Sequence, residues 1–295
     1  MNFAKIVKQC RIDRPGHFKL ADHDPAETFG LSTNIEDVRP ILAEGIAKLA
    51  DGQQRLFADG QWAVLLVFQG MDAAGKDSVV KHVMSGINPQ GCEVHAFKAP
   101  SAEELDHDFL WRVERRVPAR GHIGIFNRSH YEEVLVVRVH PELLERQNLP
   151  PSATGKNIWK HRFKEIRAFE QHLVRNGTIV LKFHLRISKD EQRKRFLARL
   201  DEPSKRWKFS VNDVAERERW DDYMAAYQDM IRETSTDYAP WYVVPANHKH
   251  VTWLVVSAAI IEALEKLKLE YPKVTGKALK DLKKAERALK TEGKR

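Results

Sequence analysis

The chain has 295 residues, of which 42% are hydrophobic and 31% charged, and it carries 49 Lys and Arg against 41 Asp and Glu. This composition excludes a largely disordered chain, and the length suffices for a full buried core. The formal charge of +8 favours polyanionic partners such as nucleic acid, anionic lipid or phosphate-rich ligands, but charge alone does not choose among them.

The cysteine content and the absence of long apolar runs indicate the compartment. Cys10 and Cys92 lie far apart and form neither a CxxC motif nor a disulfide framework, so we expect reduced thiols. The N-terminus lacks the apolar stretch of a signal peptide, and no apolar run approaches the roughly 20 residues that span a bilayer. We therefore expect a cytoplasmic protein with no membrane partner.

The first 60 residues are predicted to form an N-terminal arm and one helix. The arm is polar and rich in turn-forming residues to about Asn34, and a helical pattern occupies residues 35–56. The apolar positions that recur at helical spacing are Val38, Ile41, Leu42, Ile46 and Leu49. This spacing predicts a helix that packs on a sheet.

Five short β-rich apolar runs follow, separated by helical patterns. They lie at residues 63–69, 91–98, 121–127, 178–187 and 241–245. Strands spaced in this way by helices predict a parallel sheet covered on both faces, which is a three-layer α/β fold with right-handed crossovers. We find no internal repeat and no convincing linker, so we expect one domain over residues 1–295.

The C-terminal part of the chain is predicted to be helical. Residues 251–269 show an amphipathic pattern, and residues 275–295 form an Ala- and Lys-rich helical stretch. The basic tail, taken as residues 273–295, is a candidate for binding polyanions.

A phosphate-binding loop is predicted directly after the first strand. Residues 70–77 read Gly-Met-Asp-Ala-Ala-Gly-Lys-Asp, which fits G-x-x-x-x-G-K, and a helical pattern follows at residues 78–87. Glycines let backbone N–H groups curl around phosphate oxygens, the helix N-terminus adds partial positive charge, and Lys76 neutralises the transferred group. The alternative is a plain strand, turn and helix. The predicted phosphate-binding positions are Gly70, Ala73, Ala74, Gly75, Asp77 and Ser78.

The same motif raises the question of how a metal ion would be held. Asp77 replaces the Ser or Thr whose hydroxyl usually binds Mg²⁺. Asp72, inside the loop, is the candidate replacement, with a turn-forming cap as its alternative role. Asn127 ends the third strand where an acidic residue is expected, and its amide oxygen can coordinate Mg²⁺ or Mn²⁺ or their waters but cannot act as a base. Arg128, the next residue, is predicted to contact phosphate.

Several motifs together resemble the type-2 polyphosphate kinase family over residues 60–267. They are the loop GMDAAGKD, the strand end FNRSHYEEVLVVRVHPE, and the later segments WKFS and APWYVVPA. The resemblance implies a thymidylate-kinase-like P-loop fold with a helical lid. It also implies Mg²⁺-dependent, reversible transfer of phosphate between inorganic polyphosphate and nucleotides, from AMP or ADP to ADP or ATP, with GMP and GDP as further acceptors to consider.

The resemblance also implies roles for single residues. Asp72 is similar to the family's metal-binding aspartate, Lys76 to its phosphate-binding lysine, and Arg128 to the arginine of its second motif. Asn127 and Glu132 stand where many members have Asp and Asn, which resembles the subgroup that phosphorylates both nucleoside mono- and diphosphates. Glu132 and Glu133 are the candidates for reading the nucleotide. Members tend to form dimers or tetramers, so we expect a homo-oligomer.

A lid and a basic groove are predicted around this site. Residues 188–215 contain a basic helix, a Pro/Ser turn and a second basic stretch, and a lid of this kind closes arginines over phosphates. The resemblance implies that the lid arginines fall at Arg195 and Arg199, within about one helical turn, and a solvated helix face is the alternative. The candidates for the groove, each of which taken alone fits a surface charge, are Lys81, His82, Lys98, Arg112, Arg115 and Arg116.

Two other functions remain open on the sequence. An ATP-dependent nucleoside or nucleotide kinase on the same fold would explain the loop and the lid equally well. A nucleic-acid-binding protein, with residues 273–295 as its binding segment, is a less favoured alternative, and we expect no specific nucleic-acid partner. The extended motif match favours polyphosphate as donor.

Overall fold

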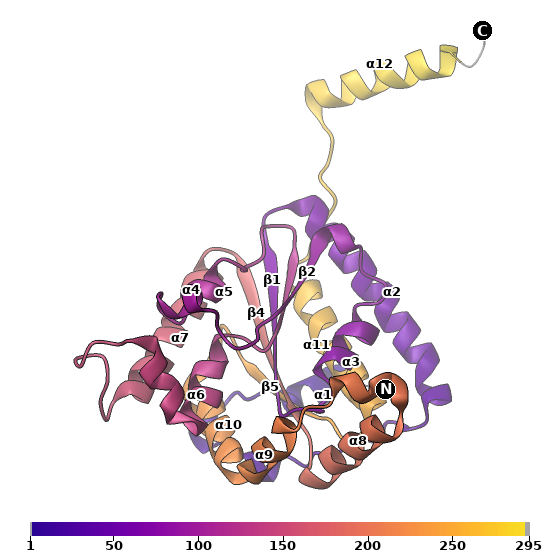
Figure 1. Cartoon of the computed structure of the whole chain (residues 1–295). Helices are drawn as coiled ribbons and strands as arrows, with labels where there is room; N and C mark the ends of the chain where they lie inside the picture. The colour runs from indigo at the N-terminus through magenta and orange to yellow at the C-terminus, as the bar shows by residue number, and fades with distance from the viewer. Residues whose placement is uncertain (1, 293–295) are drawn as a thin grey trace.

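The computed structural model describes residues 2–292 and contains one five-stranded sheet (Figure 1). The strand order is β2-β3-β1-β4-β5, and every neighbouring pair is parallel. The strands are β1 (Ala63–Gln69), β2 (Cys92–Ala96), β3 (Ile123–Asn127), β4 (Thr178–Arg186) and β5 (Trp241–Pro245). Each lies within its predicted run, so the predicted parallel sheet is confirmed.

Helices cover both faces of the sheet, as the prediction of three layers requires (Figure 1). On one face, α11 (Lys249–Lys266) packs against α2 (Ile35–Asp59) and α3 (Lys76–Val83). On the other, α7 (Ile158–Arg175) packs on β4 and against α10 (Trp220–Thr234). The shorter helices are α4 (Ala102–Leu105), α5 (Trp111–Glu114), α6 (Val136–Val139), α8 (Lys189–Asp201) and α9 (Asn212–Glu218).

The central strand shows why the sheet forms. All seven residues of β1 are buried, and its sequence AVLLVFQ is continuously apolar until Gln69. A strand that is covered by helices on both faces needs apolar residues at successive positions rather than at alternate ones. The pattern of β1 therefore places it in the middle of the sheet.

The N-terminal arm differs from its prediction. Instead of turns alone, the arm contains the helix α1 (Phe3–Cys10), whose Ile6, Val7 and Cys10 are buried. This helix packs against α11 and β5. It escaped prediction because only two helical turns carry the apolar spacing, which is too short a pattern to separate from a polar arm.

The helix α2 begins and ends with recognisable caps. The side chain of Asn34 accepts a hydrogen bond from the Glu36 N–H at 3.1 Å, and Gly60 ends the helix at φ 65°. The helix thus extends three residues beyond its predicted end. It runs along the sheet and delivers the chain to the start of β1 (Figure 1).

The C-terminal helix α12 (Gly276–Glu292) stands away from the rest of the molecule (Figure 1). Within the described chain it buries none of its residues. The predicted helical tail is confirmed over this range, and its last three positions, 293–295, lie outside the described residues. Among residues 2–292, no helix has both the length and the apolar character needed to cross a membrane.

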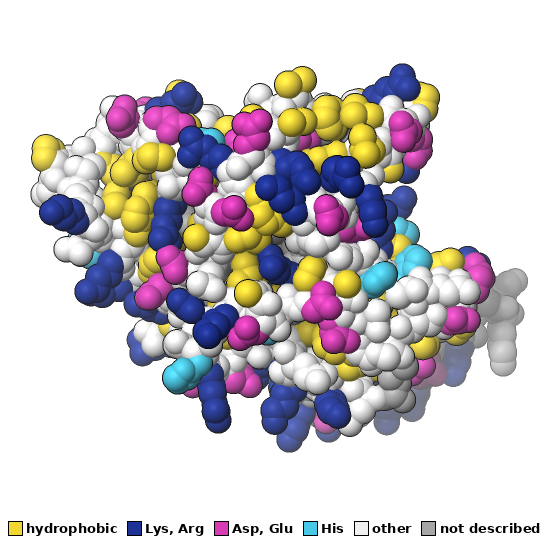
Figure 2. Space-filling view, turned by 90° about the horizontal axis from the view of Figure 1, so that it is seen from below, with side chains coloured by type: hydrophobic (Ala, Val, Ile, Leu, Met, Phe, Trp, Pro, Cys, Tyr) yellow, Lys and Arg dark blue, Asp and Glu magenta, His cyan; other side chains and the backbone are white. Residues whose placement is uncertain are grey.

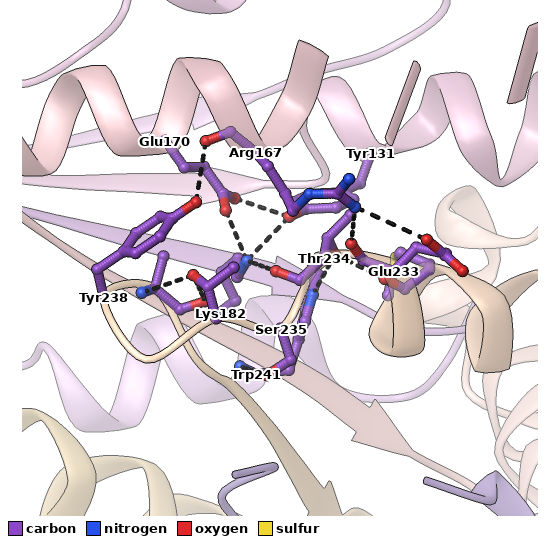
Figure 3. A network of polar contacts seen from close by, with 12 residues as sticks. Tyr131, Arg167, Glu170, Lys182, Glu233, Thr234, Ser235, Tyr238 and Trp241 are labelled. Atoms are coloured by element: carbon purple, nitrogen blue, oxygen red, sulfur yellow. Dashed lines mark hydrogen bonds and ion pairs between the residues drawn. The ribbon is translucent and has the colours of Figure 1, made fainter. Parts of the chain in front are cut away.

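A buried polar network surrounds Tyr131, which follows β3 (Figure 3). The Lys182 ammonium donates hydrogen bonds to Glu170 Oε2 at 2.6 Å, to the Tyr131 hydroxyl at 3.0 Å and to the Thr234 carbonyl at 2.7 Å. Tyr131 in turn donates to Glu170 Oε1 at 2.7 Å. Burial raises the pKa of Glu170, but Lys182 and His130 together outweigh burial and leave the pKa below its usual value. The network fixes Tyr131 between β4, α7 and the end of α10.

Replacing Lys182 by Met should destabilise the fold strongly. The substitution leaves Glu170 buried without its cation, which costs about 3–5 kcal/mol of unfolding free energy. Urea unfolding followed by circular dichroism measures the loss. A matched double variant, Lys182→Met with Glu170→Leu, removes both charges and should recover most of it. If the double variant were no more stable than the single one, the ion pair would not be the cause.

Candidate active site

The predicted phosphate loop joins β1 to α3 at the carboxyl edge of the sheet. Gly70 has φ 152°, and a Cβ there would approach the Leu185 carbonyl oxygen to 2.8 Å, so a side chain does not fit. Gly75 has φ 109° and stands immediately before α3. Ala73 and Ala74 line the loop, and Ser78 lies in the first turn of α3. The strand, loop and helix N-terminus are therefore arranged as an anion site requires.

Lys76 points back into this loop. Its Nζ donates to the Gly70 carbonyl at 2.6 Å and to the Met71 carbonyl at 3.4 Å. Burial lowers the pKa of Lys76, and the neighbouring Arg128 lowers it further, whereas Asp72 and Glu132 act in the opposite direction. The Lys76 amine is thus held against the backbone carbonyls at the start of the loop.

Arg128 connects the loop to the end of β3. Its guanidinium lies 2.7 Å from Asp72 Oδ1 and 3.9 Å from Glu132 Oε2. Its φ of 63° is a left-handed conformation, which is unusual for a side-chain-bearing residue and is a form of strain that concentrates at functional sites. The structure therefore brings together the predicted residues Asp72, Lys76, Arg128 and Glu132 from two motifs far apart in the sequence.

The charges in this cluster shift one another. The Glu132 carboxylate raises the pKa of Arg128, and Asp72 adds to the shift. Burial raises the pKa of Asp72, but the charges of Lys76 and Arg128 outweigh it, so that this pKa falls below its usual value. For Glu132, burial dominates and raises the pKa. Asp72 is therefore the more firmly ionised of the two carboxylates.

The predicted metal residues lie in two adjoining contacts. Asn127 donates its side-chain amide to Asp77 Oδ1 at 2.7 Å, while Asp72 contacts Arg128. Among residues 2–292 there is no group of three or more His, Cys, Asp or Glu side chains arranged to hold a metal ion. Mg²⁺ often binds to only one or two carboxylates and takes its other ligands from water and substrate phosphates. The oxygen donors of Asp72, Asp77 and Asn127 fit such an ion.

The helix α8 contacts the backbone of the phosphate loop through Arg195. The Arg195 guanidinium donates to the Ala73 and Ala74 carbonyls at 2.9 and 3.0 Å, and to the Ala246 and Asn247 carbonyls at 2.6 and 3.0 Å. Its Nε donates to the Glu191 carboxylate at 2.8 Å. These contacts number five, as many as the N–H donors of a guanidinium. Arg195, predicted to close over phosphates, is placed here as a clamp on loop carbonyls.

The other predicted lid arginine has different surroundings. Arg199 lies one turn further along α8, half-buried, with its guanidinium 5.6 Å from the centre of the Phe196 ring. Its charge helps to lower the pKa of Asp72. After α8 the chain forms a 3₁₀ segment (Pro203–Lys208), which contains the predicted Pro/Ser turn and second basic stretch, and then the helix α9, which was not predicted from the sequence.

The predicted groove residues fall into two groups on this face. Lys81 and His82 lie at the end of α3, where the His82 ring stacks on Trp253 with centroids 3.9 Å apart. Lys98 lies beyond β2, and its carbonyl accepts a hydrogen bond from Arg112 at 2.9 Å. Figure 2 looks onto this carboxyl edge and shows Lys and Arg side chains gathered around its middle, with Asp and Glu among them.

Sequence reasoning missed several side chains that shape the site. Gln192 on α8 is buried and donates to the Asp72 carbonyl at 3.0 Å. Lys249 at the start of α11 has its pKa lowered by burial and then by the charge of Arg195. Lys249 follows the end of β5 after three residues, and this position could have indicated it, because all five parallel strands end at the same edge. Gln192 offers no comparable signal.

Comparisons with known proteins agree with this geometry. The sequence profile described as Polyphosphate kinase 2 (PPK2) matches residues 34–272. The chain belongs to the polyphosphate kinase 2 family. An "ADP-polyphosphate phosphotransferase" of Rhodopseudomonas palustris is 54% identical over 94% of this chain and 96% of that protein. An "AMP/ADP-polyphosphate phosphotransferase" of Meiothermus ruber is 46% identical over 90% of this chain and 96% of that protein.

Solved structures confirm the fold of this polyphosphate kinase 2 family member. The crystal structure of Polyphosphate Kinase 2 from Arthrobacter aurescens TC1 superposes with a TM-score of 0.87 at 42% identity, covering 99% of this chain and 97% of that one. The predicted three-layer P-loop kinase fold is therefore confirmed. α12 lies beyond the residues that the family profile matches.

Proposed function

We propose that this chain transfers phosphate reversibly between inorganic polyphosphate and the nucleotides AMP and ADP, forming ADP and ATP. The observation that carries the proposal is the convergence of Lys76, Arg128 and Asp72 at the end of β1 within a polyphosphate kinase 2 sequence. The names of the two relatives, an ADP- and an AMP/ADP-polyphosphate phosphotransferase, support these substrates. Incubation with polyphosphate and AMP or ADP tests it directly.

Phosphoryl transfer depends mainly on positively charged and N–H groups that are in position before the reaction, and the site supplies such groups. The transition state spreads negative charge over the equatorial oxygens of the transferred group. In our proposal the loop N–H groups and Lys76 bind those oxygens, and Arg128 meets them from the end of β3. Since these groups are held by the fold, they stabilise the transition state without being reoriented during the reaction.

One acidic and one amide side chain complete this arrangement. Asp72 would hold Mg²⁺, or Mn²⁺, together with the amide oxygen of Asn127, and the ion would neutralise charge on the bound phosphates. The acceptor is a nucleotide phosphate, which is already anionic at neutral pH, so the site needs no strong general base. Asn127 is therefore compatible with catalysis. One phosphoanhydride is broken as another is formed, which makes the transfer reversible.

The lid segment has two roles in this proposal. Arg195 is a positioning residue. Its hydrogen bonds hold the Ala73 and Ala74 carbonyls, and this would leave the N–H groups of the loop to face the phosphates. Arg199, one turn away, is the arginine available to approach bound phosphate. Lys81, His82, Lys98 and Lys249 line the basic surface that would receive the polyphosphate chain. Assembly into dimers or tetramers, a single domain and a cytoplasmic location stay predictions.

Replacing Glu132 by Asn should shift the acceptor preference from AMP toward ADP by about tenfold in the ratio of kcat/KM values. Glu132 shares Arg128 with Asp72, so losing its charge changes the field where the acceptor phosphate would bind. Steady-state assays with each acceptor at saturating polyphosphate measure the ratio. The matched control is Glu145→Asn, at an exposed glutamate. An unchanged ratio would remove Glu132 from acceptor recognition.

A further inference from the structure

The C-terminal helix α12 separates its charges by face. Its six cations fall on one continuous arc when successive residues are turned by about 100° around the helix axis. No acidic residue of α12 lies within that arc. The six cations are Lys277, Lys280, Lys283, Lys284, Arg287 and Lys290. Four of them, at positions 280, 283, 284 and 287, line one hollow on the helix surface.

The opposite side of α12 is apolar and bordered by acids. Ala278, Leu282, Ala285 and Leu289 lie together about 180° from the middle of the cationic face. An interfacial helix on an anionic membrane inserts its apolar side and needs its cations beside it, at the lipid headgroups. Here Asp281, Glu286 and Glu292 border the apolar side instead. The arrangement therefore favours a soluble polyanion on the cationic face rather than a lipid surface.

The shape of the cationic face fits a linear ligand. From Lys277 to Lys290 it extends about 20 Å along the helix axis. All six of its side chains are exposed. Within the described residues of α12, Lys290 forms an ion pair with Glu286. A flexible chain with a negative charge on every unit can follow such a row of cations over its whole length.

The position of α12 separates this face from the phosphate loop. α11 starts at the carboxyl edge, near the loop, and its 18 residues carry the chain about 27 Å to the opposite edge. α12 leaves the molecule there, beyond residues 267–275, as Figure 1 shows. A short phosphate chain bound at the loop would not reach it.

We propose that the cationic face of α12 is a second binding site for long-chain inorganic polyphosphate, which tethers the substrate outside the phosphate loop. The proposal rests on the proposed function, because polyphosphate is the linear polyanion that this function places at the same protein. When one part of a polyphosphate chain is bound to α12, the rest of that chain stays near the phosphate loop. This raises the effective concentration of the substrate at the loop. Only polyphosphate chains long enough to bind α12 and the phosphate loop at the same time gain from this second site.

The test neutralises the face without touching the loop. The variant carries Lys280→Gln, Lys283→Gln, Lys284→Gln and Arg287→Gln. A matched control neutralises four exposed cations on α1 and α7, Lys8, Lys160, Lys164 and Arg175, and so has the same net charge. Binding of labelled long-chain polyphosphate is measured by anisotropy without nucleotide, so that no phosphate is transferred. We expect the α12 variant to bind about tenfold more weakly than the control, with the difference fading at high salt.

Kinetics with two donor lengths complete the test. With long-chain polyphosphate the α12 variant should show a KM about tenfold above that of the control at an unchanged kcat, whereas with tripolyphosphate both variants should behave alike. Equal binding and equal KM values for the two variants would overturn the proposal. So would loss of duplex DNA binding with polyphosphate binding intact, which would assign the face to nucleic acid. Absence of phosphotransfer in the unaltered protein would contradict the proposed function instead, and the anisotropy result would still decide on the α12 site.

Discussion

Replacing Lys76 by Met is expected to lower kcat by about 10²–10³-fold while the fold stays intact. The Lys76 Nζ lies 2.6 Å from the Gly70 carbonyl, at the mouth of the loop, and Met fills a similar volume without the charge. In the proposed reaction this cation meets oxygens whose negative charge grows in the transition state. The main loss should therefore appear in kcat rather than in KM.

Two measurements make the Lys76 result interpretable. Circular dichroism and thermal unfolding show whether the variant is folded, and Lys164→Met, an exposed lysine on α7, controls for loss of one positive charge. A Lys76→Met protein with kcat within a few-fold of the unaltered enzyme would contradict the assignment of the phosphate loop.

The Asp72→Asn variant should be the second most severe, with kcat lowered by about 10²-fold and a higher Mg²⁺ concentration needed for half-maximal activity. The amide keeps the size of the side chain and removes the charge. Because the pKa of Asp72 is held below its usual value by Lys76 and Arg128, the carboxylate is ionised at neutral pH and available to a cation.

The Mg²⁺ titration separates two roles for Asp72. If Asp72 holds the metal, its loss moves the midpoint of the titration. If it only orients Arg128, to which it lies 2.7 Å away, kcat falls while the midpoint stays where it was. The second pattern would contradict the metal assignment. Asp190→Asn, at an exposed position on α8, is the matched control.

The parts of the site that the sequence predicted are those carried by short, local patterns. The loop from Gly70 to Lys76 combines a buried strand, two glycines and a helix start within a few residues, so its shape follows from local chemistry. Arg128 was predictable because it follows a strand, and parallel strands end at one edge. Its contact with Asp72 then follows from the pairing of β1 with β3.

The parts that escaped prediction depend on packing between distant segments. Arg195 lies 122 residues beyond Ala73, and no local pattern indicates that its guanidinium binds the carbonyls of the loop. The sequence of a basic helix does not show whether its arginines bind phosphate or backbone carbonyls. The pairing of Glu170 with Lys182 is equally invisible, because a charged residue in a strand or helix is expected at the surface until the fold buries it.

The most direct test of the proposed function is nucleotide analysis after incubating the purified protein with Mg²⁺, long-chain polyphosphate and AMP or ADP, beside a reaction in which ATP is the only donor. We predict that ADP and ATP form in proportion to the polyphosphate consumed, and that Lys76→Met abolishes their formation. Transfer from ATP to AMP, with none from polyphosphate, would contradict the proposal and make the protein a conventional nucleotide kinase on the same fold.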